Sequence, residues 1–115
     1  MVKLPEEAFL LRVHCGESDR WHGLPLYEAI VRKARELHLA GATVLRGSMG
    51  FGAGSRIHTA KLLRLSEDLP VVVEIIEGRE KIDEILPHLD EMVEDGLVTL
   101  ERVQVLKYHA KSASD

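Results

Sequence analysis

The strongest constraint on this chain is a hydrophobic periodicity that changes from strand to helix and back, twice in succession. Alternating or β-branched segments predict strands, and apolar residues three or four positions apart predict amphipathic helices. The expected strands lie at about 8–14, 42–49, 70–77 and 97–108, and the expected helices at about 24–40 and 79–94. Two consecutive β-α-β units predict an α+β fold, a ferredoxin-like βαββαβ sandwich with two helices on one face of a four-stranded antiparallel sheet.

Length and composition are those of one small domain. The chain has 115 residues, 45% of them hydrophobic and 30% charged, which predicts a single domain over 1–115 with a loop at about 50–69 and a polar tail at 109–115. A net charge of -4 and an aromatic content of 4% argue against nucleic-acid binding. No apolar run reaches the length of a membrane span, so no membrane insertion is expected. A single cysteine excludes an internal disulfide, and the expected location is the cytoplasm.

Three positions within the expected elements carry predictions of their own. Gly41 is expected to close the first helix. Pro87 lies inside the second helix, where the missing backbone hydrogen bond and a steric clash predict a kink. Cys15 lies at a strand end and is expected to be a buried, inert thiol.

The sheet face that the helices leave uncovered is expected to be half apolar and half ionisable. Its expected members are charged residues among apolar ones: Arg12, His14, Arg46, Glu74 or Arg102, and Leu10, Val44, Leu100 and Leu106. Such a face is too apolar to remain in water, and mixed apolar and polar rows are typical of subunit interfaces. The pattern therefore predicts an oligomer.

The segment 46–59 combines glycines with positive charge. It contains four of the nine glycines of the chain, together with Arg46, Arg56 and His58. Glycine is typical of positions where φ is positive or where a ligand approaches the backbone closely. Free N–H groups beside arginines can bind an anion. The segment is therefore either an anion-binding cradle or a long, mobile hairpin loop.

Several motifs in combination resemble one known family. They are Gly16-Glu17-Ser18-Asp19, Gly23-Leu24-Pro25-Leu26-Tyr27-Glu28-Ala29-Ile30-Val31, Gly41-Ala42-Thr43-Val44-Leu45-Arg46-Gly47, Gly50-Phe51-Gly52, Ser55-Arg56-Ile57-His58-Thr59 and Leu69-Pro70-Val71-Val72-Val73-Glu74. Over about 9–107 the chain resembles the PII-like family called domain of unknown function one-ninety. The resemblance implies a subunit of the PII superfamily that forms a homotrimer and binds an adenine nucleotide in clefts between subunits.

The resemblance also implies where a nucleotide and a partner would bind. The segment at about 47–70 would contact a partner protein, such as a transporter or an enzyme, with 54–64 as its moving part. The nucleotide would be bound by the first half of this segment and by one arginine of the last strand: Arg46, Gly47, Ser48, Met49, Gly50, Phe51, Gly52 and Arg102. The connection 94–98 is acidic and lacks lysine, which favours AMP or ADP over a triphosphate.

Further candidate ligand contacts lie after the first strand and within the glycine-rich segment: Glu17, Asp19, Arg20, Ser55, Arg56 and His58. The first three have an alternative role in a solvated turn with a local ion pair. An arginine within a strand needs an anionic partner. Arg102 is accordingly expected to be half-buried and paired with Glu74, with Glu101 or with a ligand.

The six histidines show no metal-ligand spacing, so neither a metal site nor a required cofactor is expected. His38 lies on the apolar side of the first helix and is expected to pack or to cap. His58 alone among the histidines is a candidate ligand contact. No catalytic set can be identified from spacing.

Three functions remain open on the sequence alone. The first is a non-enzymatic signalling protein that binds an adenine nucleotide and presents a loop to a partner. The second is an enzyme acting on a nucleotide or small phosphorylated metabolite, with His58 as acid or base and Arg46 or Arg56 stabilising phosphate charge. The third is a structural oligomer without a ligand.

Overall fold

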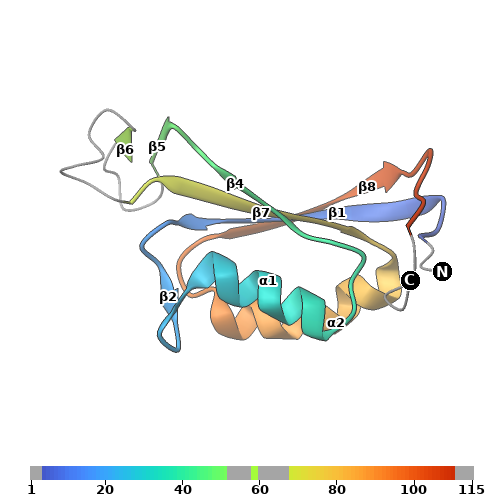
Figure 1. Cartoon of the computed structure of the whole chain (residues 1–115), viewed down its shortest axis with the longest axis horizontal. Helices are drawn as coiled ribbons and strands as arrows, with labels where there is room; N and C mark the ends of the chain where they lie inside the picture. Colours follow the sequence, from blue (N-terminus) through green and yellow to red (C-terminus); the bar gives the residue numbers. More distant parts are fainter. Residues whose placement is uncertain (1–3, 52–57, 60–67, 111–115) are drawn as a thin grey trace.

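Four antiparallel strands and two helices form the two layers of the molecule (Figure 1). The computed structural model describes residues 4–51, 58–59 and 68–110. The sheet has the order β4-β7-β1-β8, with strands β1 (Glu7–Gly16), β4 (Thr43–Arg46), β7 (Pro70–Glu77) and β8 (Leu97–Gln104). Helices α1 (Leu26–Glu36) and α2 (Arg79–Met92) cover one face of it. The predicted ferredoxin-like α+β fold is confirmed.

Two short hairpins accompany the sheet: one lies within the segment 46–59, where the sequence left a hairpin loop as an alternative, and the other was not expected from the sequence. The first pairs β5 with β6 and the second pairs β2 with β3; the bounds of β2, β3, β5 and β6 are Arg20–Trp21, Leu24–Pro25, Met49–Gly50 and His58–Thr59. β4 ends at Arg46, whereas the sequence predicts a strand as far as 49. None of the described helices is both long and apolar enough to cross a membrane.

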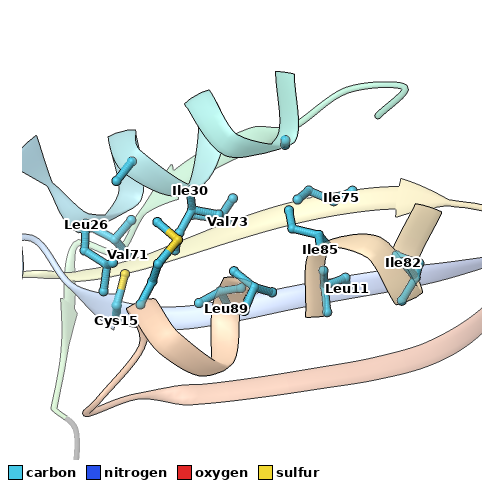
Figure 2. Close-up of a cluster of buried hydrophobic side chains, with 14 residues drawn as sticks. Leu11, Cys15, Leu26, Ile30, Val71, Val73, Ile75, Ile82, Ile85 and Leu89 are labelled. Carbon is cyan, nitrogen blue, oxygen red and sulfur yellow. The ribbon is translucent and has the colours of Figure 1, made fainter. Parts of the chain in front are cut away.

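The hydrophobic core lies between the sheet and the two helices (Figure 2). Alternate residues of β1 and β7 point into it and meet one stripe of each helix; the largest contributors are Leu11, Val13, Val71, Val73, Ile75, Ile30, Ile82, Ile85 and Leu89. Full burial of one such side chain stabilises the fold by about 1.5–3 kcal/mol. Cys15 is part of this cluster, so its predicted burial is confirmed. The two periodicities of the sequence thus correspond to the two layers of one core.

Helix α1 ends with a residue in the left-handed region. His38 has φ 62°, its N–H donates to the Arg35 carbonyl at 3.0 Å, and the Leu39 N–H donates to the Ala34 carbonyl at 2.9 Å. These two bonds around a left-handed residue define the Schellman ending of a helix. The prediction that Gly41 closes the helix is therefore wrong, and the predicted capping role of His38 is confirmed.

Glu77 joins the start of α2 to the segment that follows α1. Its carboxylate is buried and accepts hydrogen bonds from the Ala40 N–H at 2.7 Å and the Gly78 N–H at 2.8 Å. A carboxylate at a helix N-terminus is also favoured by the helix dipole. Helix α2 then runs as one element with Pro87 inside it, and a kink at Pro87 stays a prediction.

The sheet face opposite the helices carries a charged row between apolar rows. The Arg12 guanidinium donates from Nε to Glu74 at 2.9 Å and from Nη1 to Glu101 at 2.7 Å. The hydrogen bonds that Arg12 donates, first to Glu74 and then to Glu101, raise the pKa of Arg12 above its usual value. Exposed apolar side chains flank this row: Leu45 is 49% exposed, Ile76 41% and Leu97 55%.

The strand register changes which residues share that open face. Val44, Arg46, Leu100 and Arg102 stand opposite residues of the helix-facing rows, namely Val73, Val71, Leu11 and Phe9, so their assignment to the open face is wrong. Leu106 lies beyond the end of β8. Alternation separates the two faces of one strand but does not say which face meets the helices, because pairing with the neighbouring strand decides it.

Arg102 is exposed, and the structure gives both of its expected carboxylate partners to another arginine. Glu74 and Glu101 pair with Arg12, and within the described part of the chain Arg102 forms no ion pair. The expectation of a half-buried Arg102 held by one of these acids is therefore wrong. Arg102 lies on the helix-facing side of β8, whereas Glu74 and Glu101 lie on the open face and are already paired with Arg12.

Replacing His38 by glycine should raise the free energy of unfolding by about 0.5–1 kcal/mol, because glycine adopts a positive φ without a Cβ penalty. Chemical denaturation followed by circular dichroism measures the change. Gly41→Ala is the matched control and should cost little, since a Cβ at position 41 meets no atom within 4 Å. A destabilised His38→Gly variant would contradict the Schellman ending.

Candidate functional site

Arg46, at the end of β4, is bound by the turn that follows β1. Its Nη2 lies 2.7 Å from Glu17 Oε2, with the Arg46 side chain 56% exposed and the Glu17 side chain 22% exposed. The Glu17 backbone N–H donates to the Leu69 carbonyl at 2.8 Å. Glu17 therefore contacts both chain segments that flank 51–67. We call this region, residues 16–19, 46–50 and 68–70, the loop base.

Two aspartates complete the hydrogen bonds of the loop base. Asp68 Oδ1 accepts from the Ser18 N–H at 3.0 Å, and Asp19 Oδ2 accepts from the Gly16 N–H at 2.9 Å. The Asp68 carboxylate lies so close to Gly16 that a Cβ there would overlap it. Sequence reasoning did not identify Asp68, because a single acid before a strand has no distinguishing local pattern. Asp19, a candidate ligand contact, stabilises its own turn through this bond.

Gly47 and Gly50 both pack against Pro70. A Cβ at Gly47 would lie 2.7 Å from Pro70 Cγ, and one at Gly50 would lie 2.9 Å from the same atom. The Gly47 N–H also donates to the Pro70 carbonyl at 2.7 Å. Neither glycine has a positive φ; among the described glycines that conformation belongs to Gly23. Packing against Pro70 within the chain therefore accounts for glycine at both positions.

The structure divides the predicted nucleotide contacts between two edges of the sheet. Arg46 ends β4 at one edge, the residues up to Phe51 follow it, and Met49 and Phe51 are largely exposed there. Arg102 lies on β8, at the opposite edge. Within one chain the fold therefore brings Glu17, and not Arg102, to Arg46.

The remaining sequence candidates are placed only in part. Arg20 donates to the Gly23 carbonyl at 2.9 Å and so stabilises the β2–β3 hairpin. Gly52, Ser55 and Arg56 lie outside the described residues. His58 pairs through its backbone with Gly50 in the β5–β6 hairpin. Across 4–51, 58–59 and 68–110, no three side chains of the metal-ligating types gather into a group.

A hollow on the helix side of the molecule has the wrong charge for a phosphate. It lies between α2 and the start of β8 and is lined by Asp83, Leu86, Pro87, Leu89, Asp90, Val93, Gly96 and Val98. Its two carboxylates would repel an anion. The loop base also holds carboxylates, but it exposes the Arg46 guanidinium beside them, with a side chain that is 56% exposed.

Comparison with known proteins decides the family. The family model DUF190, described as "Uncharacterized ACR", matches residues 8–105. The chain belongs to the DUF190 family. This DUF190 protein is 41% identical over 97 residues to the "UPF0166 protein" of Aquifex aeolicus (strain VF5), and the match covers 84% of this chain and 91% of the relative.

Two solved structures of PII-like proteins share this fold. CPII from Thiomonas intermedia K12, a nitrogen regulatory PII-like protein bound to ADP, AMP and bicarbonate, matches with a TM-score of 0.68 at 14% identity, covering 88% of this DUF190 chain and 90% of CPII. A putative PII-like signaling protein from Thermus thermophilus matches with a TM-score of 0.59 at 19% identity, covering 86% and 89%. The resemblance to PII-like proteins is confirmed, and at these identities the likeness is one of fold.

Gly47→Ala should lower the free energy of unfolding by about 1–3 kcal/mol, because the added Cβ overlaps the Pro70 ring. Pro70→Ala removes the obstructing Cγ, so the same glycine substitution should cost less in that background. Urea denaturation of the four proteins of this double-mutant cycle measures the coupling. Equal costs in both backgrounds would show that Pro70 is not the reason for the glycine.

Cys15 should react slowly with thiol reagents in the folded protein. Burial, followed by the charges of Asp19 and Asp68, raises the pKa of the Cys15 thiol from 9.0 to about 11. At pH 8 the thiolate fraction then falls about 100-fold. Labelling followed by absorbance, with the unfolded protein as control, measures the ratio of rates. Equal rates in the two states would contradict a buried thiol beside two carboxylates.

Proposed function

We propose that this DUF190 protein is a non-enzymatic, PII-like regulator that acts in the cytoplasm. It forms a homotrimer, binds an adenine nucleotide, with AMP or ADP favoured, between subunits, and presents the segment 47–70 to a partner protein such as a transporter or an enzyme. The observation that carries the proposal is the fold match with CPII, which was solved with ADP and AMP.

The open sheet face supports assembly. Leu45, Ile76 and Leu97 are exposed on it, and apolar side chains that flank charged ones in this way are typical of protein interfaces. The two edge strands β4 and β8 also carry apolar residues on both of their faces, which is typical of strands that are covered on both sides. A ring of copies would cover the open face and join one copy's β8 edge to the next copy's β4 edge.

Such a ring also supports a nucleotide site between subunits. Arg46 and Arg102 lie at opposite edges of a single chain, so a site that used both arginines would need a second copy to supply one of them. Arginine forks bind phosphate oxygens through paired N–H donors. Two guanidinium groups suit a monophosphate or diphosphate, and the acidic α2–β8 connection disfavours a longer anion.

The residues of the loop base support binding rather than proton transfer. The carboxylates of Asp19 and Asp68 accept hydrogen bonds from backbone N–H groups, and the Glu17 carboxylate is paired with Arg46. Groups engaged in this way hold two chain segments in place. A ligand that changed these contacts would alter how the segment 47–70 is presented.

Titration with AMP, ADP, ATP and adenosine, read as the shift in melting temperature and by calorimetry, tests the proposal. A ligand at 100 times its Kd stabilises the folded state by about 2.7 kcal/mol, so AMP or ADP should raise the melting temperature by several degrees. Light scattering during size-exclusion chromatography should give the mass of three chains.

Arg46→Gln should weaken ADP binding, and Arg32→Gln is its matched control. Arg32 pairs with Glu28 on the exposed side of α1, so its loss should leave the Kd unchanged. No shift with any nucleotide, or a monomeric mass, overturns the proposal. Conversion of the bound nucleotide, detected by chromatography, would instead show an enzyme.

A further inference from the structure

The guanidinium of Arg46 is already bound to a carboxylate. Its ion pair with Glu17 is 2.7 Å long and is the one ion pair that Arg46 makes among the residues described. The Arg46 side chain is more than half exposed, so its other N–H donors are open to solvent. Any anion that approaches Arg46 therefore meets a cation whose Nη2 already has a carboxylate partner.

Glu17 is held in place from several directions. Its own N–H is bonded to the Leu69 carbonyl, the next N–H is bonded to Asp68, and Asp19 closes the turn by accepting from Gly16. The backbone at position 17 is thus attached to the end of the segment 51–67, while the side chain is attached to Arg46 before that segment. A shift of the turn would have to break several of these bonds, so the carboxylate stays beside Arg46 unless its side chain rotates.

We propose that Glu17 is a specificity-determining residue of the nucleotide site, because its carboxylate competes with a ligand phosphate for Arg46. This inference rests on the proposed function. A phosphate takes two parallel N–H donors of an arginine, whereas Nη2 is engaged by Glu17. A phosphate beside an unmoved Glu17 would also place like charges within about 5 Å, where they repel even in water.

The competition has two consequences. A ligand without phosphate gains nothing from displacing Glu17, so the residue discriminates by phosphate charge and not by the nucleoside. Displacement also breaks the side-chain link to β4 while the bond from the Glu17 N–H to Leu69 persists. Phosphate binding therefore loosens the connection between the two sides of the loop base.

Glu17→Gln tests the inference, since glutamine keeps the size of the side chain and removes its negative charge. Calorimetry at low ionic strength should show ADP binding roughly three- to tenfold tighter than in the wild type. The Kd of adenosine should not change. Glu28→Gln, which removes a carboxylate paired with Arg32 on α1, is the matched control and should leave both values unaltered.

Two further variants separate competition from a structural role. Glu17→Ala retains the backbone bond to Leu69 and should tighten ADP binding in the same direction. In a protein that already carries Arg46→Gln, Glu17→Gln should not tighten ADP binding, and a double-mutant cycle measures this coupling. If Glu17 had only a structural role, its replacement would lower the stability of the fold and weaken the binding of ADP and adenosine alike.

The outcomes distinguish this inference from the proposed function. If the wild type binds ADP and Glu17→Gln binds it equally or more weakly, the competition is refuted and the nucleotide site stands. If neither the wild type nor any Glu17 variant binds ADP, both are refuted. Tighter binding of ADP by the variants, with adenosine unchanged, supports both.

Discussion

Two helices can cover only one face of a four-stranded sheet, and the rest of this structure depends on that limit. The covered face forms the core with α1 and α2. The other face is left uncovered, and there apolar side chains flank the ion pairs of Arg12. Because Arg12 is already paired, covering this face would bury no unpaired charge at that position, which suits the proposed contact with a second copy. The uncovered face is thus the part of the fold on which the proposed assembly depends.

In the loop base, residues that pack the chain lie beside those of the proposed binding site. Gly47 and Gly50 make room for Pro70, and this close approach places the end of β4 beside the turn that contains Glu17. Glu17 of this turn then binds Arg46 through an ion pair at the surface. A surface pair of this kind contributes only ~0–1 kcal/mol to stability, so it can be exchanged for a ligand at little cost. The proposed binding would therefore act on a weak surface contact rather than on the core.

Much of the fold was predictable because its signals are local. The β-branched run of β7 and the helical spacing of α1 and α2 each lie within a few turns of chain, and they yielded the correct order of elements. The faces of Val44 and Arg46 were not predictable, because β4 is apolar on both sides and its phase is set by pairing with β7. The end of α1 was missed for another reason: a histidine, rather than the nearby Gly41, adopts the left-handed conformation. Of the candidate site, the sequence identified Arg46 and Glu17 but not their contact with each other.

The sequence by itself determined the class of the fold, the family and the residue types available to a ligand, because periodicity and motifs are properties of neighbouring residues. The tertiary structure alone decided which of those residues meet. Glu17 and Arg46 are separated by α1 in the chain, and only the antiparallel pairing of β1 and β4 with β7 brings them together. The same pairing gives Glu74 and Glu101 to Arg12 and leaves Arg102 at the opposite edge from Arg46. Long-range contacts are set by strand register, which no local pattern specifies.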